Sequence, residues 1–383
     1  MPTFVRRAFA VLGVASGLSF AGPAVASANN ASGHVYVNDN TSGTNTISGY
    51  DRHADGSLTP LRGSPFVAGG SGTGTGLASQ GAIQVSSDGR YVLAVDAGSD
   101  QISVLAIHPD GTLALVPGGP VSSGGSTPVS VAEHNGLVYV ANAGSANANY
   151  AGFVLGSRGQ LEPLADSTFP LPATAQPGDV LFNPDGRNLV GTRVGATPAD
   201  SAIDSFRVER DGRLEPAPGS PFPAQGPGPF GSEFRPTDPD QLFVSNAHGG
   251  PGAGTVSAFQ VARDGTLSSI GDSPFADNQT APCWVEITHD GRFLFTVNTA
   301  SGSISSYQIA PNGAPHLLAS TLINGGNGAS AVDARLSTDG RDLYVNETKF
   351  GLIGEFAVTG GTLTETGSVP VPTGAGAAGV AVN

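Results

Sequence analysis

The sequence predicts an all-β fold: a seven-bladed β-propeller of four-stranded antiparallel blades, with the ring closed by pairing of the C-terminal strand with the N-terminal blade. Three observations support this prediction. One hairpin phrase recurs seven times at intervals of 48 to 55 residues, a second hairpin phrase alternates with it, and the chain starts and ends on different strands of the repeat. Four short strands in a unit of about 50 residues are typical of a propeller blade.

The first phrase is a predicted turn between the third and fourth strands of each unit. It reads as an acidic or small residue, then Gly, then any residue and Leu, as in Asp55-Gly56-Ser57-Leu58. An Asp-Gly pair between alternating strands favours a hairpin because the turn needs positive φ. The other copies start at Asp110, Arg158, Asp211, Asp264, Asn312 and Gly360. Three units are then predicted to end in a near-identical Ser-Pro-Phe segment, within 63–66, 219–222 and 272–275. The Pro of this segment suits an outer edge or a strand end.

The second phrase is a predicted turn between the first and second strands. Its copies start at Asp88, Asn135, Asp185, Asp290 and Asp339, and the fifth unit has an expanded turn at 237–240. The chain opens with a second-strand segment from His34 to Asn38 and closes with a first-strand segment from Gly379 to Asn383. We therefore expect the last strand to complete the first blade. This closure replaces disulfides, because Cys283 is the only cysteine.

The first 28 residues are predicted to be a signal peptide, and residues 29–383 a single propeller domain. Arg6 and Arg7 precede an apolar run over 8–20, and small residues suitable for cleavage follow at 24–28. The arginine pair resembles a twin-arginine export signal. We therefore expect a secreted or periplasmic protein. No later stretch approaches 18 apolar residues, so we expect no membrane anchor. The net charge of −14 argues against binding to nucleic acid.

The repeats resemble the seven-bladed β-propeller lactonase family, which includes propeller-type 6-phosphogluconolactonases and carboxymuconate cyclases. The resemblance covers residues 33–383 and is carried by the two hairpin phrases and by the segment Ala281-Pro282-Cys283-Trp284-Val285. It implies lactone chemistry, but propellers host many functions. The His positions of characterised bacterial members are replaced here by Gly178-Asp179 and Phe230-Gly231, so the resemblance does not extend to their phosphosugar site.

The mouth of the central channel is the expected site, on the face where the second-to-third-strand loops emerge. Aligned on their turns, the first strands place Gln84, Leu181, Glu233, Glu286 and Arg335 at equivalent positions. The catalytic candidates are Glu286, Arg335, Glu233, His248 and Arg193. The binding candidates are Asp179, Trp284, Asp333, Asn298, Asn346 and Glu347. Charges on inner strands need partners, so Glu286 and Arg335 could also form a purely structural ion pair.

Two functions remain open. The first is hydrolysis of a lactone or ester, with a carboxylate or His248 assisting water and Arg193 or Arg335 stabilising the oxyanion. The second is a non-catalytic propeller that binds a carbohydrate or a protein through its long Gly- and Asn-rich loops at 142–150, 194–201 and 248–254. We expect a monomer with a small lactone or sugar as its ligand, and no cofactor. No histidine pair has zinc-ligand spacing, so no metal site is predicted.

Overall fold

The computed structural model describes Met1 and residues 31–195, 199–326, 330–372 and 374–383. Apart from Met1, the predicted signal peptide over 1–28 lies outside the described residues, so it stays a prediction. Residues Ala31–Asn383 form one compact unit. No helix among the described residues is long and apolar enough to cross a membrane.

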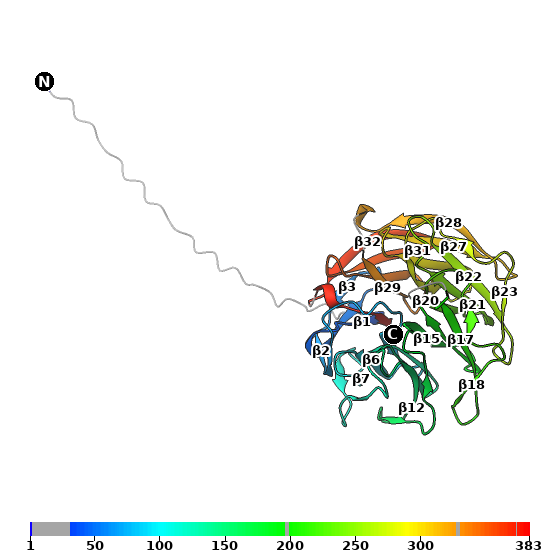
Figure 1. The fold of residues 1–383 in the computed structure, drawn as a ribbon. Coiled ribbons are helices and arrows are strands. Elements are labelled where there is room, and N and C mark those ends of the chain that lie inside the picture. Colours follow the sequence, from blue (N-terminus) through cyan, green and yellow to red (C-terminus); the bar gives the residue numbers. More distant parts are fainter. Residues whose placement is uncertain (2–30, 196–198, 327–329, 373) are drawn as a thin grey trace. The chain divides into compact units, whose positions relative to one another are not determined.

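In the part of the chain that the structure describes, seven antiparallel sheets form the blades, as predicted, and Figure 1 shows them arranged in a ring around a common centre. The innermost strands are β33 (Val380–Val382), β5 (Ile83–Val85), β10 (Pro128–His134), β15 (Pro177–Phe182), β20 (Pro229–Arg235), β25 (Pro282–Ile287) and β29 (Ala331–Leu336). The second strands are β1 (Gly33–Asn38), β6 (Tyr91–Asp96), β11 (Leu137–Asn142), β16 (Asn188–Arg193), β21 (Asp238–Asn246), β26 (Phe293–Asn298) and β30 (Asp342–Glu347).

The outer half of each blade consists of a third and a fourth strand. The third strands are β2 (Gly43–Arg52), β7 (Gln101–Ile107), β12 (Asn149–Leu155), β17 (Ala202–Val208), β22 (Thr255–Val261), β27 (Ser303–Ile309) and β31 (Leu352–Thr359). The fourth strands are β3 (Leu58–Pro60), β8 (Leu113–Leu115), β13 (Leu161–Pro163), β18 (Leu214–Pro216), β23 (Leu267–Ser269), β28 (Pro315–Leu322) and β32 (Thr362–Pro370). The described residues add two short 3-10 helices, Asn324–Gly326 and Gly374–Gly376.

The outer edge of the first five blades differs from the prediction. In blades 1, 4 and 5 the Ser-Pro-Phe segment does not end the blade, because from its Phe onward the chain pairs again with the third strand. The chain also pairs again with the third strand in blades 2 and 3. These added strands are β4 (Phe66–Gly72), β9 (Val121–Ser122), β14 (Phe169–Pro170), β19 (Phe222–Pro223) and β24 (Phe275–Ala276). Pro has no backbone N–H to donate, so it interrupts an edge ladder without removing the strand beyond it.

The Asp-Gly turns form as the sequence predicts, and the aspartate closes each of them. In the third-to-fourth-strand turn of the second blade, Asp110 accepts hydrogen bonds from the backbone N–H and the hydroxyl of Thr112. Gly111 follows with φ +78°, a conformation that favours glycine. The same aspartate-to-backbone bond recurs at Asp55, Asp211 and Asp264. Local chemistry thus determines where each blade turns.

The ring closes through β33. Its residues pair with β1 in the register Val35↔Val382, Tyr36↔Ala381 and Val37↔Val380. The backbone of Asn383 continues the ladder by exchanging hydrogen bonds with His34. The predicted closure of the first blade by the C-terminal strand is therefore confirmed.

Candidate functional site: the central channel

A segment between blades 1 and 2 crosses the channel. The chain leaves β4, and Ser79 and Gln80 then lie against the innermost strands of blades on the far side of the ring. The hydroxyl of Ser79 donates to the carbonyl of Val129, and the Gln80 backbone N–H donates to the carbonyl of Gly178. Ser79 and Gln80 are buried, as is Trp284, whose indole N–H donates to the Ser79 carbonyl. The channel is therefore filled at this level.

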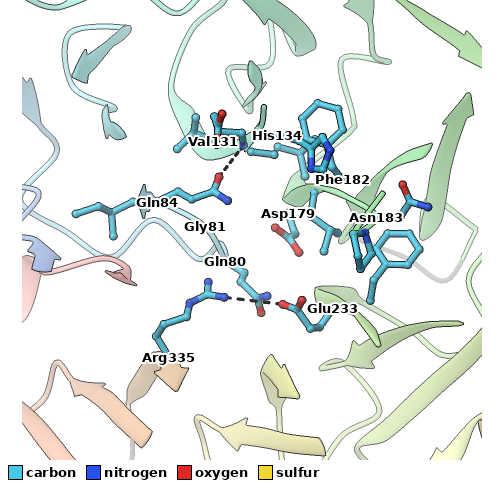
Figure 2. Close-up of a pocket in the computed structure, with 17 residues that line it drawn as sticks. Gln80, Gly81, Gln84, Val131, His134, Asp179, Phe182, Asn183, Glu233 and Arg335 are labelled. Atoms are coloured by element: carbon cyan, nitrogen blue, oxygen red, sulfur yellow. Dashed lines mark hydrogen bonds and ion pairs between the residues drawn. The ribbon is translucent and has the colours of Figure 1, made fainter. Parts of the chain in front are cut away.

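A cavity of about 200 Å³ lies between this crossing and the turns that join first and second strands. Gln80 and Gly81 line its inner end, while His134 and Asn183, next to those turns, line its outer part. Figure 2 shows Arg335 and Glu233 pointing toward one another across the cavity. This location differs from our expectation, which placed the site on the face of the second-to-third-strand loops.

Arg335 is the centre of the charged groups in this region. Its Nη1 atom lies 3.2 Å from Oε2 of Glu286 and 3.9 Å from Oε2 of Glu233. These three residues share a register, since they pair with Tyr344, Phe295 and Phe243 of the second strands. The side chain of Glu286 is 8% exposed, whereas that of Glu233 is 24% exposed. Glu233 is thus the carboxylate of the pair that a ligand can reach.

Two further carboxyls lie nearer the crossing segment. Asp179 accepts hydrogen bonds from the backbone N–H of Ser232 at 3.0 Å and from its hydroxyl at 2.7 Å. Asp333 sits in a bulge between Val332 and Ala334, with φ +42°, and accepts a bond from the N–H of Val380 in the closing strand. Both aspartates are almost fully buried. Each one therefore links its own blade to a neighbour.

Burial raises the pKa of these carboxyls because it penalises the charged form. The pKa of Glu233 rises to about 8, through burial first and then through repulsion by Glu286. Burial raises the pKa of Asp179 to about 7 and that of Asp333 to about 6. The pKa of Glu286 is also raised by burial, although Arg335 opposes the shift. Near neutral pH the cavity therefore holds groups that can take up or release a proton.

Of the candidate residues, Asp179, Glu233 and Arg335 line this cavity, and Glu286 and Asp333 lie beside them in the charged group. Five others lie apart from that group. Arg193 is paired with Asp204, with its Nε atom 2.6 Å from Oδ2. The amide group of Asn298 donates to Ser303 and Ser305 within its own blade, and Glu347 is bonded to Asn324. Asn346 is fully buried, and the backbone N–H of His248 donates to the carbonyl of Pro227. The structure therefore groups Glu233, Glu286, Arg335, Asp179 and Asp333 and leaves these five apart.

Sequence reasoning missed Gln80 and His134. Gln80 lies in a Gly- and Ser-rich connection with no strand pattern, so nothing local shows that it enters the channel. His134 ends β10, and its place beside the cavity depends on how far that strand extends. Among the described residues, no three His, Cys, Asp or Glu side chains come together as metal ligands.

Comparison with known families adds to this geometry. The sequence profile described as "Lactonase, 7-bladed beta-propeller" matches residues 22–168 and 233–377. The chain belongs to this lactonase family. The matched ranges include Glu233, Glu286 and Arg335, whereas Asp179 lies between them. A search of curated proteins finds no match.

Solved structures similar to this lactonase-family chain share its fold. A candidate 6-phosphogluconolactonase of Bacteroides uniformis is 20% identical with a TM-score of 0.74, covering 92% of this chain and 99% of its own. A similar protein of Bacteroides fragilis is 19% identical, with a TM-score of 0.72 and coverage of 93% and 99%. A periplasmic gluconolactonase of Pseudomonas aeruginosa is 18% identical, with a TM-score of 0.70 and coverage of 90% and 98%. At these identities the likeness establishes the fold.

Proposed function

We propose that this protein hydrolyses a small lactone in the channel cavity. The observation that carries the proposal is that Glu233 and Arg335 line a cavity of about 200 Å³, with Glu286 paired to Arg335 behind them. Pockets for drug-sized ligands measure about 300–1,000 Å³, so a cavity of this size suits a single-ring substrate. Membership of a lactonase family supports the same chemistry.

In the proposed reaction Glu233 is the general base. Its carboxylate takes a proton from water as the water oxygen attacks the lactone carbonyl carbon. The resulting oxyanion is stabilised by Arg335, which Glu286 holds in place. The carbon–oxygen bond of the ring then breaks, and the proton returns from Glu233 to the leaving ring oxygen. The product is the open hydroxy acid, and the enzyme regains its starting state.

The charges around the cavity favour an uncharged substrate. Its lining includes the carboxyl groups of Glu133, Asp179 and Glu233, and Arg335 is already paired with Glu286. A phosphate or carboxylate on the substrate would meet these groups without a free cation among the described lining residues. We therefore propose an unphosphorylated lactone, such as that of a simple aldonic acid.

The test is hydrolysis of glucono-1,5-lactone by the purified protein, followed in a pH-stat and corrected for spontaneous opening. Glu233→Gln should lower kcat by about 10²–10⁴-fold, the usual contribution of a general base. Arg335→Lys keeps the charge but moves it, and should lower kcat by about 10²-fold. Glu162→Gln, at an exposed glutamate on β13, is the matched control and should keep wild-type kcat.

Because Glu233 must be ionised to act, the wild-type rate should rise with pH and reach half of its plateau near pH 8. A Glu233→Gln protein with wild-type kcat would exclude this mechanism. Thermal stabilisation by sugars without turnover of any lactone would instead support a propeller that only binds carbohydrate.

A further inference from the structure

One side chain connects the two strands that carry the glutamates. The carboxamide of Gln80 donates from Nε2 to the carbonyl of Ser232 at 2.8 Å. Its Oε1 accepts from the backbone N–H of Val285 at 3.0 Å. Gln80 comes from the connection between blades 1 and 2, whereas Ser232 is on β20 of blade 5 and Val285 is on β25 of blade 6.

Each of these contacts falls one residue before a glutamate. Ser232 precedes Glu233, and Val285 precedes Glu286. On blade 4 the backbone N–H of Gln80 donates to Gly178, the residue before Asp179, at a position two residues earlier in the first strand. In a strand, neighbouring side chains point to opposite sides, so holding one backbone group determines the direction of the next side chain.

Blade 5 leaves space for this carboxamide. A Cβ atom on Gly231 would lie 2.2 Å from Oε1 of Gln80 and 2.6 Å from the carbonyl oxygen of Cys283. Gly231 does not have positive φ, so the backbone conformation does not require glycine there. The close approach of the Gln80 carboxamide and of the Cys283 carbonyl oxygen does require it.

We propose that Gln80 is a positioning residue, which sets the spacing of Glu233 and Glu286 around Arg335 by bridging their two strands through one carboxamide. The effect of Gln80 on catalysis rests on the proposed function, whereas its bridge between β20 and β25 does not depend on the substrate. An amide is suited to this bridge because it donates from one atom and accepts at the other, whereas a carboxylate or an apolar side chain cannot do both.

Gln80→Met tests the proposal, because methionine has a similar length and makes neither bond. A misplacement of about 1 Å can cost 10²-fold in rate, so we expect kcat to fall by about 10- to 100-fold while KM changes little. The midpoint of the pH–rate profile should also move, because the distance between Glu233 and Glu286 sets their mutual repulsion. Ser79→Ala is the control, since it removes one bond of the same segment to Val129 and leaves the Gln80 bridge intact.

A second readout does not require activity. In protein labelled with ¹³C at the glutamate carboxyls and assigned with Glu233→Gln and Glu286→Gln, the titration of both groups should shift in Gln80→Met and stay unchanged in Ser79→Ala. If wild-type protein opens no lactone, the proposed function fails and this titration alone decides the role of Gln80. If Gln80→Met does not fold, Gln80→Glu replaces it, because it keeps the length and loses the donor to Ser232.

Unchanged kcat and unchanged titrations in the Gln80 variant would overturn the proposal. Equal shifts in Ser79→Ala would also overturn it, since they would show that any loosening of the crossing segment has the same effect.

Discussion

The carboxyl groups of Asp179, Glu233, Glu286 and Asp333 are placed around the single guanidinium of Arg335. Desolvation is the largest cause of the raised pKa of each carboxyl. The inner strands explain this arrangement, because each presents alternate side chains to the channel while its backbone is bonded within the blade. A polar residue at such a position is removed from water whether or not a counter-charge is present.

These raised pKa values predict that the protein loses stability as pH rises. Between about pH 4 and 8 the native Asp179, Glu233 and Asp333 bind more protons than their unfolded forms, so the free energy of unfolding must fall across this window. Asp179→Asn removes one of these groups. Its stability should therefore decline less between pH 5 and pH 8 than that of the wild type, as measured by urea unfolding at both pH values.

Asp264→Asn is the control for this measurement. Asp264 is exposed, and its pKa is lowered by hydrogen bonds from Thr266, so it titrates below the tested window. Its variant should show the wild-type slope. Parallel slopes for wild type and Asp179→Asn would contradict the assignment of a raised pKa to Asp179.

Neighbouring blades are linked by a recurring hydrogen bond from a tyrosine hydroxyl to a turn carbonyl. The hydroxyl of Tyr36 donates to the carbonyl of Gly111, that of Tyr139 to Gly212, and that of Tyr344 to Gly56. In each case a tyrosine of a second strand reaches the Asp-Gly turn of the next blade. Each of these Asp-Gly turns therefore closes its own hairpin and also accepts a hydrogen bond from the neighbouring blade. At the junction of blades 7 and 1, a buried arginine adds a second link.

We expect Arg52, at the end of β2, to contribute measurably to the free energy of unfolding through this junction. Its Nη2 atom lies 2.7 Å from Asp342 Oδ2 and 2.7 Å from Asp339 Oδ1, and its side chain is 2% exposed. Arg52→Met leaves the carboxyl of Asp342 without its partner and should cost about 3–5 kcal/mol in urea unfolding.

Asp339→Asn is the comparison for Arg52. Asp339 is 40% exposed, so its variant should cost no more than about 1 kcal/mol at neutral pH. A loss from Arg52→Met as small as that from Asp339→Asn would show that the junction is held by apolar packing alone.

At the scale of the whole molecule, stability depends on closing the ring. The described residues contain a free Cys283 and no disulfide. Three residues of β33 pair with β1, and Val380 also donates to Asp333 beside the cavity. The last strand therefore has two roles: it covers the edge of blade 1 and completes one wall of the channel.

Deletion of residues 380–383 should consequently expose the edge of β1. An open strand edge pairs with other chains, so we expect a lower Tm and the appearance of oligomers in size-exclusion chromatography. A loss of 1 kcal/mol in stability lowers the Tm of a domain of 150–250 residues by about 2–4 °C, and the truncation should lower it by more than that. Asn383→Ala keeps the backbone ladder and should behave as wild type. A truncated protein with unchanged Tm and elution volume would contradict closure by β33.

The sequence by itself determined the number of blades, their turns and the way in which the ring closes. These features depend on local chemistry: Asp-Gly pairs need a particular turn, alternating residues need a strand, and a first-strand segment at Gly379–Asn383 needs the second strand at His34–Asn38. The shared register of Glu233, Glu286 and Arg335 could also be predicted, because aligned turns place equivalent residues at equal heights in the channel.

Only the tertiary structure decided which end of the channel is filled and which residues meet there. Ser79 and Gln80 lie in a connection without periodicity, and their bonds join residues 50 or more positions away, such as Val129 and Ser232. The hydrogen bond of Asp333 likewise comes from Val380, 47 positions further along the chain. Local propensity acts over a few residues, whereas the channel is built from seven distant segments, so its closed end, its cavity and its charge balance arise only when the ring is complete.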